Sequence, residues 1–233
     1  MKSVLKTITL ITLLSLTLNA GGTDKNALKG EHVDESKVTN SDMAIETLKL
    51  GNKRFLDGKT LKQDYLSQMI ATKDGQSPYA VIVSCLDSRV PPEILFDQGL
   101  GDLFVARVAG NIENNDIIGS LEFATAAKGS KLILVLGHTS CGAVEGACSN
   151  VKLGKLTGLL SEIKPAIKTI HKLHPQMDQK SKEFSELVGP ESVRQTVNDI
   201  QTKSKVIADL VKAGKVKVVG AMYDLKTGQV TFQ

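Results

Sequence analysis

The run KLILVLG, residues 131–137, is followed directly by the polar segment HTSCG, residues 138–142. A short, almost unbroken apolar run is typical of a strand that is buried on both faces, as strands of parallel sheets are. The pattern recurs along the chain, with strand-like runs at 79–84, 103–108 and 216–222 and helical patterns at 117–128, 156–173 and 192–212. Alternating strands and helices predict an α/β fold with a central, mainly parallel sheet flanked by helices.

Both ends of this sheet domain are expected to carry an arm. A helix is predicted over residues 43–56, with Ser41 as its N-cap, and a second helix over 61–71. Residues 224–232 have the pattern of a hairpin around a Lys-Thr-Gly turn. The sequence therefore predicts an N-terminal helical arm and a C-terminal hairpin arm.

The first twenty residues have the three parts of a secretory signal: a start with two lysines, an apolar stretch at 8–18, and Asn19-Ala20 before the expected cleavage. The apolar stretch is shorter than the roughly 20 residues that a membrane-spanning helix needs. We therefore expect a signal peptide over 1–20, export to a bacterial periplasm, and no membrane segment in the mature chain. A flexible, polar spacer over 21–40 is expected to precede a single domain over 41–233.

Composition and charge are typical of an ordinary globular protein. After removal of the leader about two hundred residues remain, enough for one domain with a sizeable core. Apolar residues make up 41% of the chain and charged residues 23%, which is usual for a globular domain. The formal net charge of +4 falls to +2 once the two leader lysines are removed. That charge is too small to favour nucleic acid or an anionic membrane as a partner.

Thiol and imidazole side chains follow two of the predicted strands. Cys85 comes after the run at 79–84, and His138 and Cys141 come after the run at 131–137, in a chain with only three cysteines and four histidines. Because ligands of open α/β sheets bind at the carboxyl ends of strands, these side chains are expected to converge. Two thiolates and one imidazole can hold a zinc ion and leave a fourth position open, as catalytic zinc sites do.

Two charged residues close to the first cysteine bear on that fourth position. Asp87 can reach the same ion, or it can turn away and pair with Arg89 through two hydrogen bonds. The sequence leaves both arrangements open. The third cysteine, Cys148, is too far from Cys141 along an expected helix to form a disulfide, so we expect it to be a small buried apolar residue.

With these residues in view, the chain resembles the β-class carbonic anhydrases over residues 43–232, nearly the whole mature chain. The matching stretches lie, in the family's order, at 48–55, 75–78, 85–91, 102–107, 137–142 and 220–224. The resemblance implies that Cys85, His138 and Cys141 bind one Zn²⁺ per chain. It also implies that Asp87 and Arg89 form the dyad that controls the fourth zinc position.

The resemblance implies roles for four residues of a substrate pocket. Gln76 matches the family's glutamine that donates a hydrogen bond to substrate, and Phe104 matches an apolar wall that often comes from across a dimer interface. Gly142 matches a glycine whose backbone approaches the site, and Phe123 stands where many members have tyrosine. The chain keeps Gln76 and has no tryptophan, so it resembles the subgroup in which the aspartate of the dyad is paired with its arginine.

The activity implied by the resemblance is carbonate dehydratase: zinc-bound hydroxide attacks carbon dioxide, bicarbonate leaves, and a proton passes to buffer. Carbon dioxide and bicarbonate are then the small-molecule partners, no nucleic acid is involved, and a homodimer or homotetramer is expected. Hydrolysis of carbon disulfide or carbonyl sulfide on the same zinc site is an alternative. A zinc-binding protein without turnover is a third reading, against which the intact dyad and glutamine argue.

Overall fold

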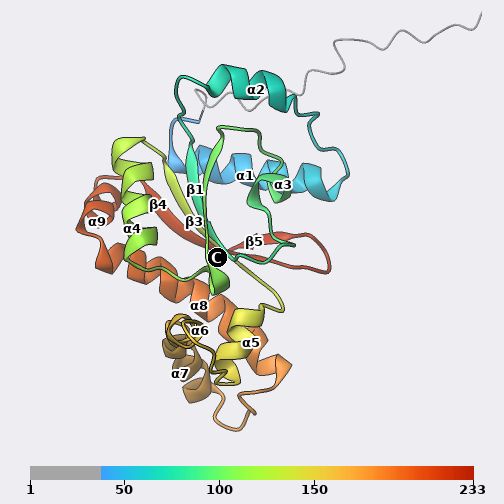
Figure 1. The fold of residues 1–233 in the computed structure, drawn as a ribbon, viewed down its shortest axis with the longest axis vertical. Helices are drawn as coiled ribbons and strands as arrows, with labels where there is room; N and C mark the ends of the chain where they lie inside the picture. Colours follow the sequence, from blue (N-terminus) through green and yellow to red (C-terminus); the bar gives the residue numbers. More distant parts are fainter. Residues whose placement is uncertain (1–37) are drawn as a thin grey trace, which may run out of the picture.

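One five-stranded sheet forms the centre of the molecule (Figure 1). It comes from a computed structural model that describes residues 38–233, so the expected signal peptide and most of the expected spacer lie outside the described residues. The strands are β1 (Ala80–Ser84), β2 (Leu103–Arg107), β3 (Leu132–His138), β4 (Lys217–Tyr223) and β5 (Val230–Phe232). Their order is β2-β1-β3-β4-β5. The first four are parallel and β5 is antiparallel to β4, which confirms the predicted sheet and its C-terminal hairpin.

Helices cover both faces of the sheet and its carboxyl end. They are α1 (Ser41–Leu56), α2 (Tyr65–Thr72), α3 (Pro92–Leu95), α4 (Asn115–Glu122), α5 (Gly142–Cys148), α6 (Leu156–Ser161), α7 (Lys164–Leu173), α8 (Lys182–Lys203) and α9 (Lys205–Lys212), with a 3₁₀ turn η2 (Ala109–Asn111) and a π-helical turn η3 (Phe123–Ala127). Figure 1 shows α1 and α3 on one face, α4, α8 and α9 on the other, and α5 to α7 beyond the carboxyl ends of the strands. No helix within residues 38–233 has the length and apolar character needed to cross a membrane.

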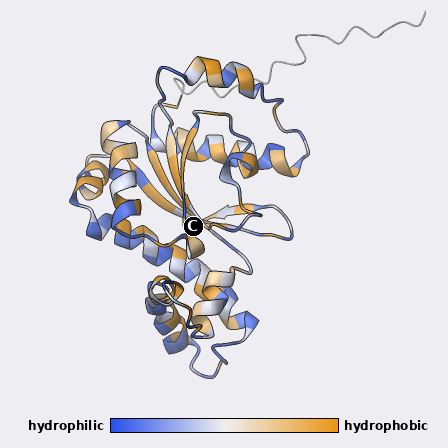
Figure 2. Cartoon of the chain, in the orientation of Figure 1, coloured by the Kyte–Doolittle hydropathy of each residue, from blue (hydrophilic) through white to orange (hydrophobic). Residues whose placement is uncertain are grey.

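Alternation along the strands explains why both faces are covered. In β1, Ile82 packs into the cluster that contains α1, whereas Val81 and Val83 pack into the cluster that contains α4, α8 and α9. Every residue of β1 and β3 is buried, and Figure 2 shows these strands as apolar bands between amphipathic helices. Full burial of one aliphatic side chain stabilises a fold by about 1.5–3 kcal/mol. The two central strands therefore anchor the sheet.

A third apolar cluster closes the carboxyl end of the sheet. Phe184 and Val188 of α8 and Ile163, just before α7, are fully buried in it. Cys85 and Cys141 belong to the same cluster. Close packing on this scale leaves side chains little freedom, so it holds the two thiols in defined positions.

The start of the N-terminal arm differs from the prediction in one detail. Asn40 caps α1, since its side-chain oxygen accepts a backbone hydrogen bond at 2.9 Å from the first turn. Ser41 is instead the first helical residue, and its hydroxyl donates to the carbonyl oxygen of Lys131 at 2.7 Å. Both residue types cap helices, so the sequence does not separate them. The second helix, predicted over 61–71, begins only after Asp64, which caps it.

The long predicted helices are interrupted. The range 156–173 contains α6 and α7, and α7 has a proline in its first turn, which suits a helix start. The range 192–212 contains α8 and α9, and Ser204 between them caps α9 by accepting a hydrogen bond from the N–H of Ile207 at 3.1 Å. α8 also begins earlier than predicted and continues through Pro190.

Candidate metal centre

Cys85, His138 and Cys141 meet at the carboxyl edge of the sheet, as the sequence predicts. β1 ends immediately before Cys85, and β3 ends at His138. The two strands are parallel neighbours, so their ends reach the same edge. Cys141 follows three positions later as the N-cap of α5, and this short turn brings its thiol back to the other two ligands.

The three side chains have the spacing of a tetrahedral metal site. The sulfur atoms of Cys85 and Cys141 are 4.0 Å apart, and the three ligand atoms all lie within 4.8 Å of one another. Zinc–sulfur bonds of about 2.3 Å at tetrahedral angles put two sulfurs about 3.8 Å apart. Nε2 of His138 is buried without a hydrogen-bond partner, which is costly unless an atom binds there. A zinc ion fits this donor set.

The second nitrogen of His138 fixes the tautomer that a metal requires. Nδ1 lies 2.9 Å from the carbonyl oxygen of Thr139. A carbonyl oxygen can only accept, so Nδ1 is the nitrogen that carries the proton. Nε2 then keeps its lone pair and points into the thiol pair. Outer contacts of this kind orient most metal-binding histidines.

Protons balance the negative charge of the thiolate among these three side chains. Contact with the Cys141 thiol lowers the pKa of Cys85 to about 4, and the same contact raises the pKa of Cys141. Burial works to lower the pKa of His138, but contact with the Cys85 thiolate outweighs it, and the pKa is raised. Negative charge is thus stabilised where a cation can replace protons.

Asp87 is paired with Arg89, one of the two arrangements that the sequence leaves open. Oδ1 of Asp87 accepts from Nε of Arg89 at 2.9 Å, and Oδ2 accepts from a terminal nitrogen at 2.7 Å. These hydrogen bonds lower the pKa of Asp87 to about 2. Oδ2 also lies 3.9 Å from Nε2 of His138, so the carboxylate stands beside the ligands with its oxygens engaged by the guanidinium.

Two further residues support the first cysteine, and sequence reasoning assigned neither this role. The N–H of Gly110 donates to Sγ of Cys85 at 3.4 Å, from a backbone with φ +73° that favours glycine. Nε of Arg107 donates to the carbonyl oxygen of Cys85 at 3.0 Å. The Ala-Gly-Asn sequence shortly after β2 is a turn signal that could have pointed to Gly110.

The four expected pocket residues do not all reach this cluster within one chain. Gly142 does, because it is the first residue of α5 and follows Cys141 directly. Gln76 is exposed and precedes β1, whereas Cys85 follows it. A five-residue strand of roughly 16 Å therefore separates the glutamine from the metal ligands.

The two aromatic residues of the expected pocket contact each other instead. Phe104 stands beside Val81 near the amino ends of the strands. Its ring meets that of Phe123 edge-on, with ring centres 6.2 Å apart. Phe123 is 51% exposed. The pair therefore forms an apolar feature at the β2 edge of the sheet rather than a wall of this chain's own metal centre.

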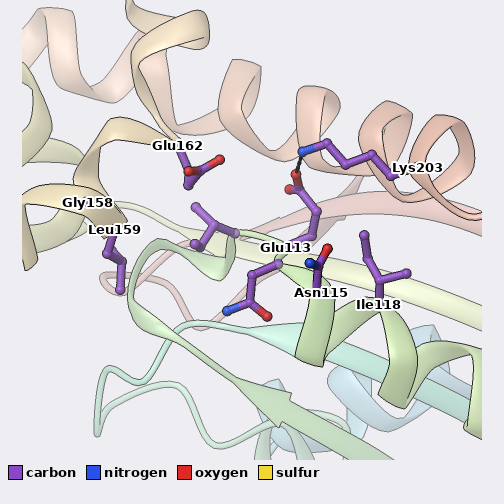
Figure 3. A pocket seen from close by; sticks show the side chains of 9 residues that line it. Glu113, Asn115, Ile118, Gly158, Leu159, Glu162 and Lys203 are labelled. Carbon is purple, nitrogen blue, oxygen red and sulfur yellow. Dashed lines mark hydrogen bonds and ion pairs between the residues drawn. The ribbon is translucent and has the colours of Figure 1, made fainter. Parts of the chain in front are cut away.

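A hollow in another part of the molecule lies away from the candidate metal ligands (Figure 3). It has a volume of about 490 Å³ and is bordered by the start of α4, by α6 and by the end of α8. Glu113 is buried there, and its carboxylate contacts Nζ of Lys203 at 2.5 Å, as the dashed line in Figure 3 marks. None of the three candidate ligands borders this hollow.

Comparison with known proteins gives a consistent result. The family model described as carbonic anhydrase matches residues 80–230. Carbonic anhydrase 2 of Mycobacterium tuberculosis is 35% identical over 206 residues, which is 84% of this chain and 94% of that protein. The carbonic anhydrase of Mycolicibacterium smegmatis is 37% identical over 192 residues, 80% of this chain and 90% of the relative. Among solved structures, the β-carbonic anhydrase CcaA shares the fold with a TM-score of 0.67 at 24% identity, covering 81% of this chain and 94% of that one.

Proposed function

The chain belongs to the β-carbonic anhydrases and is an enzyme of the carbonate dehydratase class, and we propose that it hydrates carbon dioxide reversibly at a zinc ion held by Cys85, His138 and Cys141. One observation carries the proposal: the buried, unpartnered Nε2 of His138 lies beside two thiols whose sulfurs are 4.0 Å apart. Three such ligands leave a fourth position free for chemistry. The relatives give no support to hydrolysis of carbon disulfide or carbonyl sulfide.

The residues around the ligands have separate tasks in this reaction. When bound, zinc supplies the Lewis acidity that makes water a nucleophile near neutral pH. Asp87 lies close enough to Nε2 of His138 to accept a hydrogen bond from the attacking water and to orient it. Arg89 holds the carboxylate ionised and turned away from the fourth position. The proton released in hydration then leaves to buffer.

The test is stopped-flow hydration of carbon dioxide by the purified protein, with zinc content measured on the same samples. We expect one zinc ion per wild-type chain together with turnover, and loss of both in Cys85→Ser. Cys148→Ala is the matched control, because this cysteine is buried but is not one of the three candidate ligands; it should keep both. Full zinc occupancy without turnover would contradict the proposed activity.

We further propose that the working enzyme is a homodimer or homotetramer in which a second copy supplies Gln76 and Phe104. Within one chain Gln76 is separated from the ligands by the length of β1. β2, which carries Phe104, is one of the two edge strands of the sheet, and sheet edges readily receive a further chain. The β-carbonic anhydrases of Sordaria macrospora, which share the fold with a TM-score of 0.64 at 21% identity, are described as tetrameric.

A mixing experiment tests whether Gln76 acts across an interface. Gln76→Ala keeps the zinc ligands and Cys85→Ser keeps the glutamine, so a mixed dimer of the two contains one complete site. Random exchange makes half of the dimers mixed, and turnover should recover to about a quarter of the wild-type value. Activity that merely averages the two parent variants would contradict a shared site.

We also propose that the protein is exported to a periplasm. The support is the pattern of the first twenty residues, in which two lysines and an apolar stretch precede Asn19-Ala20. Mass spectrometry of the protein recovered from a cell fraction outside the inner membrane should give a chain that begins at Gly21. A full-length chain recovered with the cytoplasm would contradict export.

A further inference from the structure

The turn between His138 and Cys141 has an unusual backbone. Two residues, Thr139 and Ser140, join the last residue of β3 to the N-cap of α5. Ser140 has φ +51°, in the left-handed region that residues with a Cβ atom rarely adopt. Such a conformation persists where its surroundings hold it in place. The shape of this turn determines where the Cys141 thiol lies relative to His138.

The first half of the turn is held by the C-terminal hairpin. The N–H of Thr139 donates to the carbonyl oxygen of Tyr223 at 3.0 Å. The hydroxyl oxygen of Thr139 accepts from the N–H of Leu225 at 3.1 Å. These bonds continue the pairing of β3 with β4 and fix the end of the turn that carries the histidine.

The second half of the turn is held by Glu186 of α8. Oε1 of Glu186 accepts from the backbone N–H of Ser140 at 3.0 Å and lies 3.3 Å from its hydroxyl oxygen, which donates to it. Hydrogen bonds to a carboxylate are stronger than bonds between neutral groups. Phe184 and Val188, on either side of Glu186 in α8, are fully buried, so the carboxylate is presented from a rigid base.

We propose that Glu186 is a positioning residue of the zinc centre. By holding Ser140 in its left-handed conformation, it sets the distance between the imidazole of His138 and the thiol of Cys141 before the metal binds. Glu186 bonds to the turn and is not one of the three candidate ligands. This inference rests on the proposed function, because it presumes zinc at the cluster. Supporting contacts of metal ligands are typically worth about 10–100-fold in metal affinity.

Zinc affinity, measured by competition with a chromogenic chelator, is the main test. Glu186→Ala should weaken zinc binding by about 10–100-fold and change the thiolate-to-metal absorption of the cobalt-loaded protein. Glu186→Gln keeps a side-chain oxygen as acceptor and should lie closer to wild type. Glu183→Ala, an exposed acid one turn earlier in α8, is the matched control and should leave affinity and spectrum unchanged. Should the alanine variant not fold, Glu186→Asp withdraws the acceptor by about 1.5 Å and should weaken binding as well.

A second substitution tests the physical reason. Glycine adopts positive φ without steric cost, so Ser140→Gly introduced together with Glu186→Ala should restore most of the zinc affinity. Wild-type affinity in Glu186→Ala, or no recovery in the double variant, would overturn the inference and leave the proposed function standing. A wild-type chain that binds no zinc would overturn the proposed function, and with it the inference.

Discussion

Two regions of the molecule, the hollow at Glu113 and the candidate metal centre, contain buried polar groups. They differ in whether those groups have a hydrogen-bond or ion-pair partner. At the hollow of about 490 Å³ beside α4 and α8, the buried carboxylate of Glu113 already has Lys203 as its partner. The cavity that borders His138 and Cys141 has a volume of only about 10 Å³, room for about one water. In the adjoining ligand cluster, Nε2 of His138 is buried without a hydrogen-bond partner. The buried carboxylate of the roomier region has a partner, and the imidazole nitrogen of the metal centre has none.

A buried nitrogen without a hydrogen-bond partner, rather than a large pocket volume, therefore identifies the proposed reaction site of this protein. A large pocket is the usual first candidate for a binding site. The larger hollow contains an ion pair whose two charges already balance each other. In the ligand cluster, the lone pair of His138 and the thiolate of Cys85 lie close together, and a cation would stabilise both. Variants in the two regions should behave in opposite ways.

The largest contrast is expected between His138→Ala and Lys203→Ala. Loss of the imidazole removes one of three ligands, so zinc content and hydration of carbon dioxide should both fall to background. Lys203→Ala leaves the ligands untouched and should keep both. Zinc analysis and stopped-flow rates on the two purified variants give the comparison, which breaks down if Lys203→Ala loses turnover while it retains zinc.

Next in size is the effect of releasing Asp87. Arg89→Ala frees a carboxylate whose Oδ2 is 3.9 Å from Nε2 of His138, and this carboxylate should then compete for the fourth position. We expect kcat/KM to fall by about 10–100-fold with zinc retained. Arg89→Lys is the matched control, since it keeps the positive charge but loses the paired hydrogen bonds to the carboxylate. Its kcat/KM should lie between those of the wild type and Arg89→Ala. An unchanged kcat/KM in Arg89→Ala would separate the dyad from the reaction.

A smaller effect is expected at Gly110, which supports the first cysteine. A Cβ atom there would lie 3.0 Å from a methyl carbon of Ile163, on a backbone with φ +73°. Gly110→Ala should lower the free energy of unfolding by about 1–3 kcal/mol and weaken zinc binding. Gly129→Ala, with φ +80° and open space around it, should destabilise the fold without weakening zinc binding. Urea titrations and chelator competition measure both, and equal zinc affinities in all three proteins would contradict a supporting role.

The smallest effect is expected from the ion pair of the roomier hollow. Burial raises the pKa of Glu113 and outweighs the nearby lysine, while contact with Glu113 raises the pKa of Lys203. A raised carboxyl pKa means that the folded chain binds the proton more tightly than the unfolded chain does. The stability contributed by protonated Glu113 is then present below the unfolded pKa and is lost as pH rises through the folded pKa.

Glu113→Gln should remove that pH dependence. At neutral pH the free energy of unfolding should change by at most about 1 kcal/mol, and hydration of carbon dioxide should not change. Glu162→Gln, an exposed acid on the rim of the same hollow, is the control and should leave the pH profile as in wild type. Urea midpoints measured from about pH 4 to about pH 8 report the effect. If Glu162→Gln removes the pH dependence as well, Glu113 is not the acid responsible for it.

The sheet and the ligand cluster could be predicted from sequence because both depend on local patterns. An apolar run such as 131–137 predicts a buried strand by itself, and strand ends in a parallel sheet share an edge. Helix boundaries were less accurate, because Ser204 looks like any other polar residue within a helical pattern until its capping bond is seen. Asn40 and Ser41 are equally good caps, so the choice between them came from packing against Lys131.

The support of the ligands could not be predicted, because it comes from contacts distant in sequence. Glu186 is 46 positions from Ser140, and Gly110 is 25 positions from Cys85. Neither residue type suggests its role without the fold. Gln76 presents the opposite case: a residue that precedes a strand must lie at the other end from one that follows it. The order of Gln76, β1 and Cys85 in the sequence supports the proposal that a second copy supplies the glutamine.

The separation of the two cysteine ligands along the chain determines when the metal can enter. Cys85 and Cys141 are 56 positions apart, and they meet only after β1 and β3 have paired. The chain between these two strands includes β2 and α4. Closing a loop of that length is slow and entropically costly, so an unfolded chain offers an ion little more than the nearby His138 and Cys141. The proposed zinc ion would then enter after the sheet has formed. On that proposal, a cell short of zinc would accumulate an inactive protein that ion supply alone can switch on.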